Sequence, residues 1–177
     1  ERCGRRFDGA DRAQRAHVAF VPDAPAFYDD LTAGEHVEFV RRANRIPREA
    51  DPSERLMDAF GLAAHRDLPP SSYSRGMRQK LALISAFLRH PRLLILDEPF
   101  VGLDPTASHL MKEFLAQLCQ EGSAVFFSTH VLEVAEKLCD KIAIIKNGRL
   151  VKSGPTQELV GDSDLESVFL ELEGEKE

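Results

Sequence analysis

The chain has 177 residues and a formal net charge of -6, from 29 acidic residues against 23 lysines and arginines. Because non-specific nucleic-acid binding depends on excess positive charge, this balance argues against a nucleic-acid partner. Hydrophobic residues make up 43% of the chain, as in ordinary globular proteins, yet no apolar run approaches the roughly 20 residues that a membrane helix requires. The three cysteines lack CxxC spacing, so we expect reduced thiols rather than disulfides.

Short apolar runs alternate with longer helical patterns, which is typical of an α/β fold with a mainly parallel sheet. Val18–Val21 predicts the first strand. Thr32 and Glu35 then have the spacing of a capping box and predict a helix, and Asp51-Pro52 predicts the start of a second helix. Because this stretch contains no predicted strand, we expect its helices to form a small subdomain beside the sheet.

The middle of the chain predicts two strands separated by a helix. Ser74 precedes a long apolar-rich helix that we expect to end near His90. Leu93–Leu96 is wholly aliphatic, as expected for a strand that is buried on both faces, and Ala124–Phe127 predicts another buried strand. Residues 110–118, between these strands, have a helical pattern.

The last part of the chain predicts a helix at Val131–Cys139 and then a β-hairpin at Ile142–Lys152. Asn147-Gly148, within the hairpin, is the strongest short-range signal for such a turn. Two capped helices are expected to follow, one from Thr156 and one from Ser163.

Two carboxylates, Asp97 and Glu98, directly follow Leu93–Leu96. Ligands of open α/β sheets bind at the carboxyl ends of the strands, so both carboxylates fall where a ligand would lie. One carboxylate there suits Mg²⁺, which prefers oxygen ligands, and the second can accept a proton from an attacking water. Taken alone, the pair is equally well explained as a solvated acidic turn.

Three further polar segments lie at or near the ends of predicted elements. Ser128-Thr129-His130 ends the second buried strand, and Ser74-Arg75-Gly76 begins a helix, where free backbone N–H groups favour an anion. Gly102–Asp104 lies between them in the sequence. Each segment has an ordinary structural explanation as a cap, a turn or a loop. Their order and spacing together carry the stronger signal.

In this order, the segments resemble landmarks of the ATP-binding subunits of ABC transporters, from about Val18 to the C-terminus. The landmarks are a signature loop at Tyr73–Met77, a Walker B strand at Leu93–Glu98, a D-loop at Val101–Asp104 and a switch histidine at His130. The Tyr-Ser-x-Gly-Met form of the signature is similar to that of exporters whose membrane part is a separate polypeptide.

The resemblance implies a P-loop NTPase-type α/β fold, with a mainly parallel sheet flanked by helices, and it implies ATP and Mg²⁺ as ligands. Residues 1–177 would form one partial ATPase domain. Residues 1–31 and 78–177 would be its core α/β part, and residues 32–77 would be a helical subdomain that ends in the signature loop.

By the same resemblance, Asp97 would hold Mg²⁺ through its water shell, and Glu98 would be the general base that polarises the attacking water. His130 would reach the γ-phosphate and fix it in line with that water. Because phosphoryl transfer depends mostly on positioning and charge stabilisation, the loss of any one of these residues should be costly.

The resemblance also implies a second ATP-binding subunit, in a homodimer or a heterodimer. Ser74 and the backbone at Gly76 would bind the γ-phosphate of ATP held by the opposite subunit, and Asp104 would link the two sites. Arg75 stands where the family signature has its first glycine. Its cation would either add attraction for phosphate or point to solvent.

Two other features depart from the family pattern. Asp23 stands where the Q-loop usually has glutamine, and its carboxylate is either an oxygen ligand for Mg²⁺ or a turn residue at a strand end. The sequence contains no Gly-x-x-x-x-Gly-Lys-Ser/Thr, the pattern that cradles phosphates. Because the chain begins at Glu1 without this pattern, we expect a piece of a longer protein. We expect this piece to lack the first part of the core sheet, to bind ATP poorly and to be inactive alone.

An integral membrane transporter subunit is the other implied partner, docked on the helices of residues 32–68 and the Asp23 loop. The chain would then be cytoplasmic and peripheral on the inner face of the cell membrane. Two other hypotheses stay open: a soluble, non-transport ABC ATPase, and a truncated non-catalytic remnant. The former usually carries two ATPase domains or long coiled-coil insertions, and this sequence shows neither.

Overall fold

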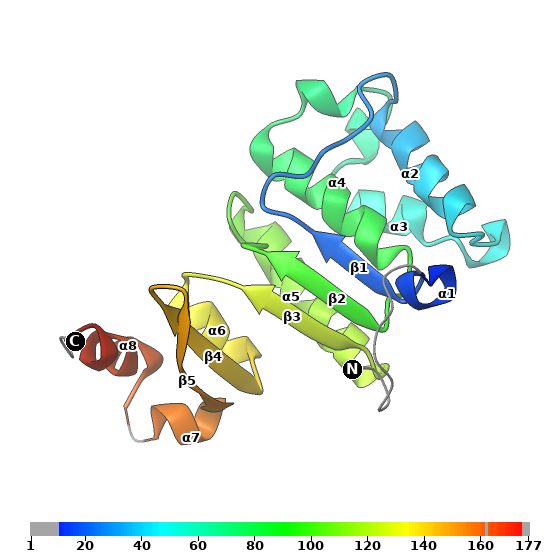
Figure 1. Cartoon of the computed structure of the whole chain (residues 1–177). Helices are drawn as coiled ribbons and strands as arrows, with labels where there is room; N and C mark the ends of the chain where they lie inside the picture. Colours follow the sequence, from blue (N-terminus) through cyan, green and yellow to red (C-terminus); the bar gives the residue numbers. More distant parts are fainter. Residues whose placement is uncertain (1–10, 162, 175–177) are drawn as a thin grey trace. The chain divides into compact units, whose positions relative to one another are not determined.

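The computed structural model describes residues 11–161 and 163–174. The chain divides after Ser128 into two compact units, each with its own sheet and its own hydrophobic core (Figure 1). The predicted division, in which residues 32–77 form a helical subdomain, follows a different boundary and stays a prediction.

The first unit contains a three-stranded parallel sheet in the order β1 (Val18–Val21), β2 (Leu93–Asp97) and β3 (Ala124–Ser128). These strands and their parallel direction confirm the predicted fold class. Val21 pairs with Leu96, which pairs with Phe127, so the carboxyl ends of all three strands lie at the same edge of the sheet.

Helices of the first unit pack against this sheet (Figure 1). They are α1 (Arg12–Arg15), α2 (Ala33–Ala43), α3 (Ser53–Ala59), α4 (Arg75–Phe87) and α5 (Pro105–Gln120), with 3-10 turns at Arg48–Ala50, Ala63–His65 and Pro70–Ser72. α4 contacts β1, α2 and α3, and α5 contacts β3. Leu81 and Ile84 of α4, together with Met111 of α5, are completely buried in the resulting core.

The two faces of the sheet differ in burial, so the prediction that β2 and β3 are buried on both faces is wrong. Leu94 and Leu96 are 0% and 1% exposed and belong to the core. Successive side chains alternate between faces, and on the other face Phe20, Ile95 and Phe126 lie side by side. Phe20 is 60% exposed and Phe126 is 63% exposed, because the described residues of this unit form their core on the face that bears Leu94 and Leu96.

The predicted start of α2 is confirmed in detail. Thr32 Oγ1 accepts the N–H of Glu35 at 3.2 Å, and the Glu35 carboxylate accepts the N–H of Thr32 at 2.8 Å. Two backbone donors of the first turn are thereby satisfied, which is how a capping box stabilises a helix end. α3 begins at Ser53 as expected after Asp51-Pro52, and Gly61, with φ 69°, follows it.

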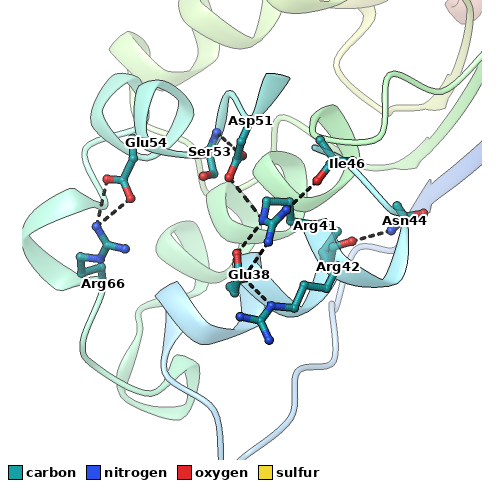
Figure 2. Close-up of polar contacts among 10 residues, drawn as sticks. Glu38, Arg41, Arg42, Asn44, Ile46, Asp51, Ser53, Glu54 and Arg66 are labelled. Carbon is teal, nitrogen blue, oxygen red and sulfur yellow. Dashed lines mark hydrogen bonds and ion pairs between the residues drawn. The ribbon is translucent and has the colours of Figure 1, made fainter. Parts of the chain in front are cut away.

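A buried arginine joins the end of α2 to the start of α3 (Figure 2). Arg41 is 8% exposed and donates to Glu38 at 2.6 and 2.8 Å and to the carbonyl oxygen of Ile46 at 2.6 Å. Its Nε also lies 3.6 Å from the Asp51 carboxylate, which accepts the N–H of Ser53 at 2.9 Å. Because a buried charge is costly unless it is paired, this network fixes the two helices against each other.

The start of α5 is earlier than predicted. The helix begins at Pro105 rather than at residue 110, and Asp104 caps it by accepting the N–H of Ala107 at 2.9 Å. Aspartate followed by proline is a strong signal for a helix start, because proline is preorganised for the first helical position. The sequence therefore contained the correct boundary.

The second unit consists of a hairpin and three flanking helices in its described part. They are α6 (Leu132–Leu138), β4 (Lys141–Lys146), β5 (Arg149–Pro155), α7 (Thr156–Val160) and α8 (Leu165–Gly174). The hairpin is confirmed: Asn147 and Gly148 have φ of 51° and 72°, and two positive values are what a type I′ turn requires. Ala135, Ile144 and Leu165 form part of the core of this unit.

The cap of α8 differs from the prediction by one residue. Asp164, rather than Ser163, accepts the N–H of Ser167 at 2.7 Å. The Ser163 hydroxyl instead donates to the carbonyl oxygen of Val160 at 2.9 Å, at the end of α7. Both side chains are favoured at helix N-termini, so the sequence alone did not distinguish them.

Candidate functional site

The carboxyl ends of β2 and β3 bring together the two predicted carboxylates and one serine. Asp97 and Ser128 end their strands and lie opposite each other. The Ser128 hydroxyl donates to Asp97 Oδ1 at 2.6 Å and accepts the N–H of Glu98 at 3.2 Å. From the sequence, Ser128 is only one of three polar residues at the end of a strand, with no role of its own. The signal was nevertheless present, because parallel strands in register place their last residues side by side.

The backbone of Glu98 has a φ of 46°, in the left-handed region. Residues other than glycine rarely adopt this conformation, and those that do are concentrated at functional sites. Here the chain leaves β2 and turns sharply into the loop that leads to α5.

The first turn of α4 is attached to the loop that follows β1. Ser74 caps the helix by accepting the N–H of Met77 at 3.2 Å. Arg75 Nη2 donates to Asp23 Oδ1 at 2.6 Å, and Arg78 Nη2 donates to the carbonyl oxygen of Pro25 at 3.1 Å. Asp23 and Arg75, the two positions predicted to depart from the family pattern, therefore contact each other.

Gly76 lies against the backbone of the loop that follows β2. A Cβ atom at Gly76 would lie far inside van der Waals contact with the carbonyl oxygen of Gly102, and Gly102 itself has a φ of 79°. Only glycine at position 76 allows this approach without a backbone shift. Gly76 thus packs the predicted signature loop against the predicted D-loop within one chain.

Asp104 has two partners in the same chain. It caps α5, and it accepts a hydrogen bond from Lys80 Nζ of α4 at 2.6 Å. The Lys80 hydrogen bond, and then the N–H of Ala107, hold the pKa of Asp104 below its ordinary value. The carboxylate is therefore ionised at neutral pH and ties the start of α5 to α4.

His130 belongs to the second unit, where it is exposed and precedes α6. Next to it, Thr129 Oγ1 accepts the N–H of Val131 at 3.1 Å and shapes the turn into the helix. Because His130 and Glu98 lie in different units, their joint action on one phosphate stays a prediction.

The acidic side chains at the strand ends fit an Mg²⁺ site that is completed by phosphates and waters. Within residues 11–161 and 163–174, no three His, Cys, Asp or Glu side chains converge on a common point where an ion would bind. Mg²⁺ is usually held by one or two carboxylates together with substrate phosphates and waters, rather than by a cage of protein ligands. The exposed carboxylate of Asp97 matches that donor set, whereas the carboxylate of Asp23 is paired with Arg75.

Comparison with known proteins identifies the family. A family model described as "AAA domain, putative AbiEii toxin, Type IV TA system" matches residues 5–136. The ABC-type transporter ATP-binding protein EcsA of Bacillus subtilis (strain 168) is 33% identical over 176 residues, which cover 96% of this chain and 71% of EcsA. The chain belongs to the family of ABC transporter ATP-binding proteins.

Two further comparisons agree with membership of the ABC transporter ATP-binding family. The uncharacterized ABC transporter ATP-binding protein YthP of the same organism is 34% identical over 154 residues, which cover 86% of this chain and 65% of YthP. A solved structure of an ATP binding subunit of an ABC transporter is 32% identical, with a TM-score of 0.83 over 91% of this chain and 70% of that chain. The chain therefore spans about two thirds of the length of these relatives.

Proteins of the ABC transporter ATP-binding family bind ATP, are generally ATPases and work in complexes with membrane subunits. The predicted landmarks of the family fall on the elements described above, with the Walker B strand on β2 and the signature loop at the start of α4. In the described part of the chain, no helix combines the length and the apolar character needed to span a bilayer.

Proposed function

We propose that this chain is part of the ATP-hydrolysing subunit of an ABC exporter. The proposal is carried by one observation: in a chain of this family, Asp97 and Glu98 are fixed by Ser128 at the carboxyl edge of a parallel sheet. That edge is where α/β proteins bind their ligands. The Tyr-Ser-x-Gly-Met form of the signature at Tyr73–Met77 supports export and a separate membrane subunit.

In the proposed reaction, Glu98 accepts a proton from water while the water oxygen attacks the γ-phosphorus of ATP. The bond between the γ-phosphorus and the leaving oxygen of ADP breaks, and the products are ADP and inorganic phosphate. His130 holds the γ-phosphate in line with the water. Asp97 holds Mg²⁺ through its water shell, and the bound ion neutralises charge on the phosphates.

The proposed active form is a dimer of ATP-binding subunits. Ser74, the backbone N–H groups at Gly76 and the cation of Arg75 contact the γ-phosphate of ATP on the opposite subunit. The N-terminus of α4 supports this role, because free N–H groups and the helix dipole favour an anion there. Asp104 lies on the loop that Gly76 contacts, which supports its role in linking the two sites.

The proposed membrane partner docks on α2 and the loop after β1, from the cytoplasmic side of the cell membrane. Tyr28 and Phe39 are 58% and 46% exposed there, and their ring centroids lie 5.2 Å apart in an edge-to-face arrangement. His36 packs behind them and is 8% exposed. Exposed aromatic side chains that pack against a buried residue are typical of protein interfaces.

The experiment is an assay of phosphate release from Mg-ATP by the full-length protein that contains this chain. We expect hydrolysis by the full-length protein and none by these 177 residues alone, because they contain no Gly-x-x-x-x-Gly-Lys-Ser/Thr. Asp97→Asn should strongly reduce hydrolysis, whereas Asp58→Asn, an exposed carboxylate on α3, should not. Absence of Mg-dependent hydrolysis by the full-length protein, with and without its membrane partner, would contradict the proposal.

A further inference from the structure

We infer that Ser128 is a positioning residue, which fixes the carboxylate of Asp97 and the backbone of Glu98 for metal binding and water activation. The inference rests on the proposed function and deepens it. Ser128 touches neither the metal nor the substrate in this account. It acts through its two neighbours.

The Ser128 hydroxyl uses its donor and its acceptor capacity at the same time. It donates a hydrogen bond to Asp97 Oδ1, and the oxygen–oxygen distance of 2.6 Å is typical of a hydroxyl that donates to a carboxylate. Its oxygen accepts the N–H of Glu98 at 3.2 Å. Alanine can do neither, whereas threonine can do both, because its hydroxyl has the same two functions.

The bond to Asp97 matters because this side chain is exposed and would otherwise rotate freely. The bond from Ser128 engages Oδ1 and restricts the rotamer of Asp97, while Oδ2 takes no part in that bond. Loss of a group that hydrogen-bonds to a metal-binding side chain typically costs about 10- to 100-fold in metal affinity or activity.

The bond to Glu98 matters because of the left-handed backbone at this residue. A φ of 46° is unfavourable for glutamate and persists only where surrounding contacts enforce it. Ser128 provides one such contact, at the residue where the chain turns out of β2. A single hydroxyl thus holds the carboxylate of Asp97 and the backbone of Glu98, from which the Glu98 side chain projects.

If the role of Ser128 were purely structural, its hydroxyl would only link the ends of two neighbouring strands. The chain contains a second serine that serves as a matched control for such a role. Ser123 directly precedes β3, at its opposite end, and its hydroxyl donates to the carbonyl oxygen of Pro91 at 2.8 Å. Ser123 and Ser128 therefore both connect β3 to the segment around β2. Only Ser128 lies at the edge that bears Asp97.

The test uses the full-length protein and the variants Ser128→Ala, Ser128→Thr and Ser123→Ala. Binding of Mn²⁺ in the presence of ATP is followed by electron paramagnetic resonance, and steady-state hydrolysis gives kcat and KM. We expect Ser128→Ala to weaken Mn²⁺ binding about 10- to 100-fold and to lower kcat more than it changes KM. Ser128→Thr should restore both quantities, and Ser123→Ala should leave Mn²⁺ binding unchanged.

Unchanged Mn²⁺ affinity in Ser128→Ala would overturn the inference while leaving the proposed function intact. An equal loss of Mn²⁺ affinity in Ser123→Ala would also overturn it, because Ser128 would then act only by linking the two strands. If the wild-type protein neither binds Mn²⁺ in the presence of ATP nor hydrolyses ATP, the proposed function is overturned, and the inference with it.

Discussion

Arg75 and Asp23 are 52 positions apart in the sequence, yet Nη2 of the arginine lies 2.6 Å from Oδ1 of the aspartate. By the resemblance to the family, Arg75 is predicted to replace a glycine of the signature loop and Asp23 to replace the glutamine of the Q-loop. Because the two side chains contact each other, we expect their effects to be coupled. In the proposed dimer, phosphate on the opposite subunit would compete with Asp23 for the same guanidinium.

The coupling between Arg75 and Asp23 should appear in function rather than in stability. Their side chains are 62% and 43% exposed, so the ion pair should contribute only about 0–1 kcal/mol to the free energy of unfolding. We expect Arg75→Ala to weaken ATP-driven dimerisation and Asp23→Ala to lower Mg-dependent ATPase activity. When ATPase activity is measured for both single variants and for the double variant, the loss in the double variant should be smaller than the sum of the two single losses on a free-energy scale, because each single change already breaks the pair.

The measurements are sedimentation with Mg-ATP and phosphate release, both on the full-length protein. Arg66→Ala is the matched control, because Arg66 forms an exposed pair with Glu54 in the same unit at 2.8 Å. Fully additive losses of activity in the double variant, or an equal loss in Arg66→Ala, would show that Arg75 and Asp23 are not functionally coupled.

Gly76→Ala should destabilise the first unit. The new methyl group would collide with the carbonyl oxygen of Gly102, and overpacking of this kind costs about 1–3 kcal/mol in the free energy of unfolding. Gly34→Ala is the matched control: it lies in the first turn of α2, and its nearest neighbouring atom would be 3.3 Å away. Chemical denaturation should show a clearly larger loss for Gly76→Ala, and equal losses would refute the close packing of the two loops.

Substitutions of Asp104 should separate its capping role from its ion pair. Asp104→Ala removes the cap of α5 and the partner of Lys80, and we expect it to lower the free energy of unfolding by about 0.5–2 kcal/mol. Asp104→Asn keeps a capping oxygen and should cost much less. The free energies come from chemical denaturation, and a similar loss in both variants would mean that the ion pair, rather than the cap, dominates.

The stability of α2 should depend on pH through Glu38. Hydrogen bonds from Arg41 and then Arg42 lower the pKa of Glu38 from its ordinary value of 4.5 to about 2. Because the pKa is lower in the folded state, ionised Glu38 stabilises the fold above pH 4.5, and this contribution disappears as the pH falls through about 2. Glu38→Gln should therefore lower the thermal midpoint at pH 7, and the difference from wild type should shrink towards pH 2. A difference that stays constant with pH would contradict the assignment.

Local sequence patterns predicted the elements whose contacts are local. The capping box of Thr32 and Glu35 and the turn at Asn147-Gly148 depend on atoms only a few residues apart, and both are confirmed. The two helix starts that were predicted at the wrong residue have different origins. At Asp104 the signal was present, and at Asp164 two neighbouring residues could serve equally well as the cap.

The contacts that build the candidate site could not be predicted from local patterns. Residue types placed Asp97 and Glu98 at a strand end, but the link through Ser128 depends on the pairing and register of β2 and β3. The contact of Gly76 with Gly102 likewise depends on the path of a loop across α4. Such details follow from the tertiary arrangement, which a single sequence does not specify residue by residue.

The most direct test of the account is the effect of Glu98→Gln on the full-length protein. The amide keeps the shape of the side chain but cannot accept a proton from water, so Mg-ATP binding should persist while kcat falls about 10²- to 10⁴-fold. Glu113→Gln, an exposed position on α5, should keep wild-type activity. Retained hydrolysis in Glu98→Gln would contradict the central claim that the end of β2 carries the general base.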